Sequence, residues 1–96
     1  MSETDLNRVS TLGMKLIPQL DEIKKQSTEE LADDLSALSV AIERLNAMVS
    51  CGESSRHDLL NAVAAVKGYS EMLLDSNDAV IGTIRSAIRR MIDELA

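Results

Sequence analysis

The sequence contains almost no aromatic residues: Tyr69 is the only one among 96, and neither Trp nor Phe occurs. Hydrophobic residues nevertheless make up 45% of the chain, so any core must be built from Leu, Ile, Val, Met and Ala, the residues that fill helical bundles. Glycine and proline are scarce, with four and one copies, and no stretch shows the polar and apolar alternation of a half-buried strand. The composition therefore predicts an all-α protein.

Cysteine, long apolar runs and excess positive charge are also missing. Cys51 is alone, which excludes an internal disulfide and a cysteine metal cluster and fits the reducing cytoplasm. No run approaches the roughly 18 apolar residues of a membrane span, and the polar start MSETD is unlike a signal peptide. The net charge of −6 argues against a nucleic-acid partner, because phosphate binding requires a basic patch. We expect a cytoplasmic protein with no membrane span and no nucleic-acid partner.

The first half of the chain carries two helical patterns. Residues 4–25 predict an amphipathic helix, in which Pro18 either causes a kink or separates a new helix beginning near Ile17. Ser27 and Glu30 form the pattern of a capping box at the start of a second helix. The apolar stripes at spacings of three and four are Leu6, Val9, Gly13, Leu16, Leu20 and Ile23, then Leu31, Leu35, Leu38, Ile42, Leu45 and Val49.

The second stripe continues in the same heptad register beyond Gly52. It reaches Leu59, Val63, Val66, Ser70 and Leu73, a match that a random restart would give about one time in seven. We therefore predict one helix over residues 27–75, about 70 Å long, with a break at residues 51–55 as the alternative. The first helix is out of this register, so it either folds back as a hairpin partner or is offset by a skip residue.

A last helix follows the short link DSND, where Ser76, Asn77 or Asp78 is the candidate N-cap. Its apolar stripe consists of Ile81, Ile84, Ile88, Met91 and Leu95. A link this short makes the two flanking helices antiparallel, so residues 56–96 form a hairpin. Two helices cannot enclose a core. The hairpin must pair with a second copy, giving a dimeric four-helix bundle, which we predict, or with the N-terminal helices of its own chain.

The only histidine, His57, lies opposite the stripe of Leu59 and Val66 because successive helical residues turn by about 100°. Asn61, Ala64 and Gly68 share its face. We expect this face to be in water, and its side chains are unusually small for a solvated helix surface. Such a flat surface around one imidazole suits a docking partner.

At this point the chain resembles a known family. Residues 54–96 resemble the dimerisation and histidine phosphotransfer domain of sensor histidine kinases, through an acid directly after the histidine, Asn four residues along and Gly-Tyr eleven and twelve along. These are His57, Asp58, Asn61, Gly68 and Tyr69. The last helix, with its Arg85, Arg89 and Arg90, is similar to the second helix of that family.

The resemblance implies two segments and a site. Residues 1–53 would be a helical, coiled-coil signalling segment, and residues 54–96 a phosphoacceptor hairpin that forms a homodimer. His57 would accept a phosphoryl group, Asp58 would orient or activate the imidazole, and Asn61 would position water for dephosphorylation of a receiver domain. An imidazole in water is largely neutral and nucleophilic at neutral pH. The chain itself needs no cofactor, because ATP and Mg²⁺ would sit on a separate kinase catalytic domain.

Two positions depart from the family pattern: Leu60 replaces its usual Arg and Ala62 its usual Pro, so the helix should be straighter after His57. These departures keep two alternatives open. One is a scaffold without the reaction that transmits signals to another output, such as a nucleotide cyclase, phosphatase or receiver. The other is a stand-alone histidine phosphotransferase that carries phosphate between receiver domains.

Overall fold

The computed structural model describes residues 3–51, 56–76 and 79–95. It contains four α-helices, α1 (Glu3–Lys24), α2 (Glu29–Cys51), α3 (Arg56–Leu74) and α4 (Arg85–Leu95), with a 3₁₀ helix, η1 (Ala79–Thr83), before the last. No strand occurs in these ranges. The prediction of an all-α protein is confirmed for them.

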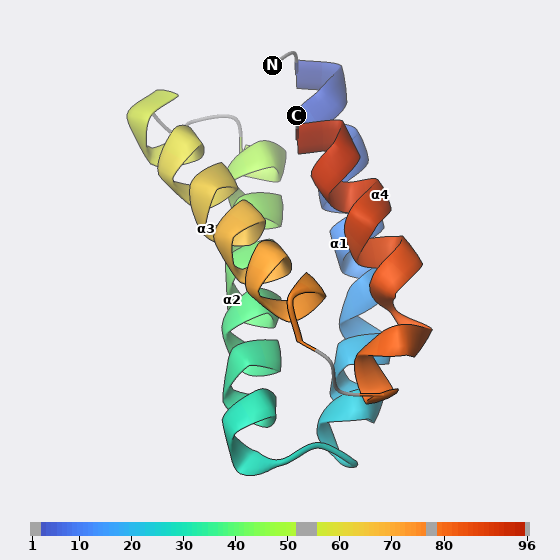
Figure 1. Cartoon of the computed structure of the whole chain (residues 1–96). Coiled ribbons are helices and arrows are strands. Elements are labelled where there is room, and N and C mark those ends of the chain that lie inside the picture. Colours follow the sequence, from blue (N-terminus) through green and yellow to red (C-terminus); the bar gives the residue numbers. More distant parts are fainter. Residues whose placement is uncertain (1–2, 52–55, 77–78, 96) are drawn as a thin grey trace.

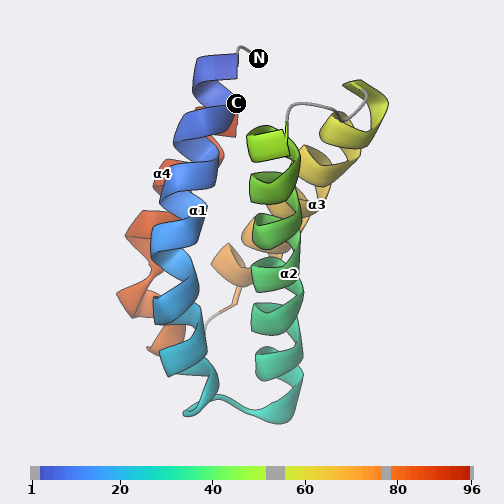
Figure 2. The same cartoon turned by 180° about the vertical axis from the view of Figure 1, so that it is seen from behind.

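The helices form an up-and-down bundle within one chain (Figure 1). Each helix packs against its neighbours in the chain, and α4 closes the ring by packing against α1. The view from behind shows the same order, with α1 beside α2 and α3 on the far side (Figure 2). The two ends of the chain lie at the same end of the bundle (Figure 1).

One hydrophobic core runs through the bundle, and every helix contributes to it. Its largest fully buried side chains are Val9, Leu16 and Leu20 from α1, Leu35, Leu38, Ile42 and Leu45 from α2, Leu73 from α3, and Ile81, Ile84, Ile88 and Met91 from η1 and α4. Ile84 lies between η1 and α4. These residues belong to the stripes predicted from the sequence, so the helical periodicity correctly identified the buried faces.

The prediction of one helix over residues 27–75 is wrong. Helix α2 ends at Cys51, α3 begins at Arg56, and the two pack side by side as antiparallel neighbours (Figures 1 and 2). The longest dimension of the molecule is 37 Å, about half of what that helix would need. Residues 52–55, which include Gly52, lie outside the described residues. The heptad register that α2 and α3 share does not mean that they form one helix. Because α3 folds back on α2, the apolar stripes of the two helices bury each other.

Helix α1 runs through Pro18 as one helix, so no new helix begins near Ile17. Pro18 is exposed, and the Met14 carbonyl that loses its partner there can turn to water. The first helix folds back on α2, which confirms one of the two predicted arrangements. The approach is close at Gly13, where an added Cβ would lie 2.5 Å from Cγ2 of Ile42.

The caps at the helix ends differ from the predicted capping box. Thr28, not Ser27, precedes α2, and its Oγ1 accepts a hydrogen bond from the amide of Leu31 at 3.3 Å. The hydroxyl of Ser27 donates instead to the Ile23 carbonyl in the last turn of α1, at 2.7 Å. Both neighbours have capping side chains, so the sequence alone did not distinguish them.

The predicted hairpin of α3 and α4 is present, and the apolar stripes of both helices are buried against α1 and α2. The four-helix bundle is thus completed by the chain's own N-terminal helices, which was the alternative to a dimer. Homodimerisation itself stays a prediction. Of the candidate N-caps, Asn77 and Asp78 lie outside the described residues. Each described helix is too short or too polar to cross a lipid bilayer.

Candidate functional site

Helix α3 presents the predicted face to solvent. Its buried side is formed by Ala62, Val63, Val66, Ser70 and Leu73. On the opposite side His57, Asn61, Ala64 and Gly68 are all exposed, as the helical angle predicted. An added Cβ at Gly68 would meet no atom within 4 Å. The exposed face is therefore open and low in relief beyond His57.

His57 lies in the first turn of α3, at the end of the bundle where the chain also begins and ends. In both cartoon views the start of α3 diverges from α2 and from α4 (Figures 1 and 2). This divergence leaves the first turns of α3 as a projecting tip. His57 is exposed there.

Asn61 lies on the same face of α3 as His57, whereas Asp58 does not. Residues four apart in a helix are neighbours on the surface, whereas adjacent residues point away from each other. Asn61, exposed one turn beyond His57, therefore lies on the same face. Asp58 is exposed in the first turn, where a carboxylate also interacts favourably with the positive end of the helix dipole. The assigned roles of all three residues stay predictions.

The two departures from the family pattern fall on opposite sides of α3. Leu60 is 52% exposed, whereas Ala62 is 3% exposed and packs into the core. The helix continues unbroken through Ala62 to Leu74, consistent with the missing proline. Leu60 adds an apolar side chain to the solvent side of the tip, where the family has a cation.

The α2–α3 side carries a groove of about 450 Å³. Its walls are mostly small side chains, with Tyr69 from α3 and Val40 and Arg44 from α2 at larger positions. No group of three or more His, Cys, Asp or Glu residues in the described ranges could hold a metal ion. Asp33 and Ser36 also line the groove, so small apolar side chains and polar groups share its walls.

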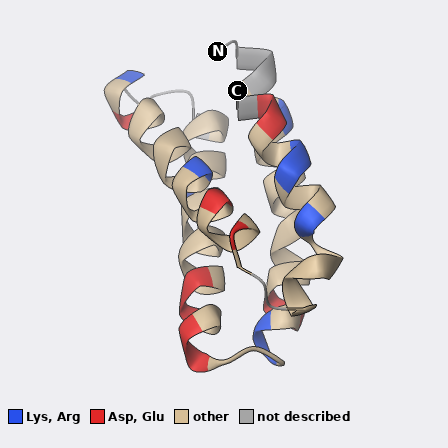
Figure 3. Cartoon of the chain, viewed as in Figure 1, with Lys and Arg blue, Asp and Glu red and all other residues tan. Residues whose placement is uncertain are grey.

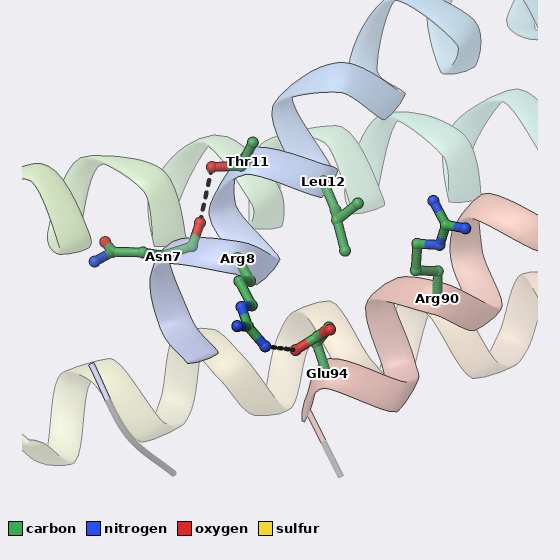
Figure 4. Close-up of a pocket in the computed structure, with 6 residues that line it drawn as sticks. All are labelled: Asn7, Arg8, Thr11, Leu12, Arg90 and Glu94. Atoms are coloured by element: carbon green, nitrogen blue, oxygen red, sulfur yellow. Dashed lines mark hydrogen bonds and ion pairs between the residues drawn. The ribbon is translucent and has the colours of Figure 1, made fainter. Parts of the chain in front are cut away.

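A second hollow, which the sequence analysis missed, lies between α1 and α4. Arg8, Leu12, Arg90 and Glu94 line it, and Arg8 Nη1 approaches Glu94 Oε2 at 3.8 Å (Figure 4). Leu12 and Arg90 face each other across the gap (Figure 4). Only the closure of the bundle brings these residues together. The single available signal was that Arg90 lies off the apolar stripe of its helix.

Arg85 has a structural role that its position in the sequence did not reveal. Its guanidinium donates from Nη1 to the Leu74 carbonyl at 2.8 Å and from Nη2 to the Ser76 carbonyl at 3.1 Å. The last carbonyls of a helix have no partner within it, and a cation there also complements the dipole. Arg85 therefore links the start of α4 to the end of α3 through two hydrogen bonds.

Neither a family model, a curated protein nor a solved structure matches this chain. The resemblance to histidine kinase domains accordingly depends on the residues around His57 and on the following helix.

Proposed function

We propose that this protein is a phosphoacceptor module of two-component type, in which His57 accepts a phosphoryl group and passes it to a receiver domain. The observation that carries the proposal is the exposed face of α3, which begins with His57 in the first turn and continues through Asn61, Ala64 and Gly68. Such a face supports a role in which a partner domain docks on α3 and brings its own catalytic groups to the imidazole.

The proposed reaction needs little from the chain beyond position. One imidazole nitrogen attacks phosphorus, an N–P bond forms, and the O–P bond to the leaving group breaks. The leaving group is ADP when a kinase domain is the donor, or an aspartate carboxylate when a phosphorylated receiver is. Because phosphoryl transfer depends mainly on alignment and charge, the Mg²⁺ of the partner domain would supply the main stabilisation.

Asp58 and Asn61 have separate roles in this proposal. Asp58 does not face His57 on the helix, so its proposed role is to favour, through its negative charge in the same turn, the positive charge that develops on the imidazole during attack. Asn61 acts in the reverse direction of signalling, by holding the water that hydrolyses a receiver's aspartyl phosphate. Its place one helical turn from His57 brings both residues to the same docked receiver.

The second candidate is a scaffold that keeps the hairpin but not the reaction. Leu60 favours it, because a leucine that is 52% exposed offers apolar contact to a partner and no charge for a phosphoryl group. Such a module would transmit signals to an attached output domain, and its homodimer would have to form through a surface other than the buried stripes of α3 and α4.

Labelling with phosphoryl donors separates the two candidates. The protein would be incubated with kinase catalytic domains plus labelled ATP, and with labelled receivers, alongside His57→Gln. The matched control is Glu71→Gln, another exposed substitution on α3. We expect acid-labile, base-stable label in the unmodified protein and in Glu71→Gln only. Equal labelling of His57→Gln, or no labelling from any donor, would favour the scaffold.

A further inference from the structure

Charge is distributed unevenly over this acidic protein (Figure 3). Acidic residues gather in the first half of α2, whereas basic residues follow α4 (Figure 3). The α1–α4 side carries two adjoining hollows of about 400 and 300 Å³ that share Leu12 and Arg90. Arg8 lines the first hollow and Lys15 the second. We call these two hollows the basic cleft.

Two cations of the basic cleft are available to an external acid. Lys15 and Arg90 are exposed and, within the described part of the chain, have neither an ion pair nor a side-chain hydrogen bond. Arg8 has Glu94 as its partner at 3.8 Å. Leu12 contributes an apolar, partly buried surface between Arg8 and Lys15 on α1. The cleft thus combines an apolar centre with cations on both sides.

The solvent side of α2 has the opposite pattern. Residues spaced four and three apart form one line there, which we call the acidic ridge: Glu29, Asp33, Ser36, Val40, Glu43 and Ala47. Val40 is 63% exposed, more than the other exposed large hydrophobics of the described residues. Asp33 and Glu43 lie on either side of it along the helix. The ridge therefore has an apolar centre with carboxylates on both sides along its line, and the exposed Arg44 lies beside this line, one turn from Val40.

We propose that the acidic ridge of one molecule docks into the basic cleft of a second copy. Val40 would pack on Leu12, and the carboxylates beside Val40 would meet the cations beside Leu12. Arg8 and Lys15 are about 10 Å apart along α1 and Asp33 and Glu43 about 15 Å along α2, a difference of about 5 Å that the long side chains of Arg8 and Lys15 would have to span. Complementary charge of this kind fixes the register of a contact and raises its rate of formation.

The positions of the two surfaces make the contact head to tail. Helices α2 and α4 are diagonal in the bundle, and the ridge faces away from the core, so the ridge and the cleft point to different sides. Two copies related by a twofold axis cannot satisfy both surfaces at once, and each added molecule leaves one ridge and one cleft free. The proposal uses α1, α2 and α4 and is independent of phosphorylation at His57.

Two variants that each damage one surface test this arrangement. Arg90→Glu reverses a cation of the cleft but keeps the ridge, whereas Val40→Lys disrupts the ridge but keeps the cleft. Both positions are exposed, so circular dichroism should report an unchanged helical fold. Lys67→Glu on the exposed side of α3 is the control for altered net charge. Sedimentation equilibrium at low and high salt gives the mass of each protein and of equimolar mixtures.

We expect the unmodified protein and Lys67→Glu to gain mass with concentration, and added salt to weaken this association by screening. Arg90→Glu and Val40→Lys should each associate at least about tenfold more weakly. Their mixture should form a closed 1:1 dimer, because an intact ridge then meets an intact cleft. A monomeric unmodified protein, undiminished association of either variant, or a mixture that stays monomeric would overturn the proposal.

Discussion

Gly13 lies at a close approach of α1 and α2, so the effect of a methyl group there depends on Ile42. An added Cβ would be 2.5 Å from Cγ2 of Ile42, a stiff β-branched side chain that is 1% exposed. We predict that Gly13→Ala lowers the free energy of unfolding by about 1–2 kcal/mol, since overpacking outweighs the gain of about 1 kcal/mol in helix propensity. Urea denaturation measures the difference.

Two comparisons isolate this steric cause. Gly68→Ala, at an exposed helical position with open space around it, should raise the free energy of unfolding by about 0.5–1 kcal/mol. Gly13→Ala should also become stabilising when Ile42 is replaced by Ala. A destabilising effect that persists without the Ile42 side chain would contradict the close-approach explanation.

Two serines make a matched pair for the cost of a buried hydroxyl. Ser70 is 0% exposed, and its Oγ has no hydrogen-bond partner among the residues that the structure describes, whereas Ser10 Oγ donates to Asn46 Oδ1 at 2.5 Å. We predict that Ser70→Ala is neutral or stabilises by about 1 kcal/mol, and that Ser10→Ala destabilises by about 1 kcal/mol. Thermal and urea unfolding check both signs. Destabilisation by Ser70→Ala similar to that by Ser10→Ala would mean that the Ser70 hydroxyl is satisfied in solution.

A substitution of Asn61 tests the proposed dephosphorylation of a receiver separately from phosphoryl acceptance by His57. Asn61→Ala should lower the rate at which a phosphorylated receiver loses phosphate by about 100-fold, the loss expected for one positioned hydrogen-bonding group. Labelling of His57 should change by less than about twofold, because Asn61 does not attack phosphorus. The release of inorganic phosphate and the labelling of the protein are measured in parallel. Equal losses in both would instead assign Asn61 to general docking.

At the scale of elements, Arg85 connects the two helices of the hairpin. Its two hydrogen bonds to the Leu74 and Ser76 carbonyls should make Arg85→Ala destabilising by about 1–3 kcal/mol, as expected for bonds that involve a charged donor. Arg89→Ala is the control, since Arg89 is exposed on the same helix and has no such bond there. In urea denaturation, we expect Arg85→Ala to lower the free energy of unfolding more than Arg89→Ala does. Equal losses would mean that the positive charge of α4, not the two hydrogen bonds of Arg85, stabilises the protein.

The sequence predicted those features of each helix that depend only on the residues within that helix. Periodicity identified the buried stripes, and it placed His57 on the exposed side of α3. It failed where the outcome depends on neighbours. The register of α2 recurs in α3 although the two helices are antiparallel, so the continuous helix was wrongly preferred to the alternative of a break at residues 51–55. At the start of α2, the adjacent Ser27 and Thr28 can both cap a helix, and Thr28 does so.

At the scale of the whole molecule, closure of the bundle determines which residues lie together on its surface. Packing of α4 against α1 creates the basic cleft from residues about eighty positions apart, and no local pattern predicts that pairing. The same closure buries the stripes that had suggested a dimer of hairpins. The exposed face of α3 needs only one helix, and for that reason the sequence predicted it well.

The most direct test of the proposed function is to identify the bond that the phosphoryl group forms on the folded protein. After incubation with a donor, ³¹P nuclear magnetic resonance distinguishes a phosphoramidate from a phosphate ester. The chain has one histidine, so His57→Gln is a complete control for phosphohistidine. We predict a phosphoramidate signal that disappears in acid and is absent from His57→Gln. A phosphate ester signal, or a phosphoramidate signal that His57→Gln retains, would contradict phosphoryl acceptance by His57.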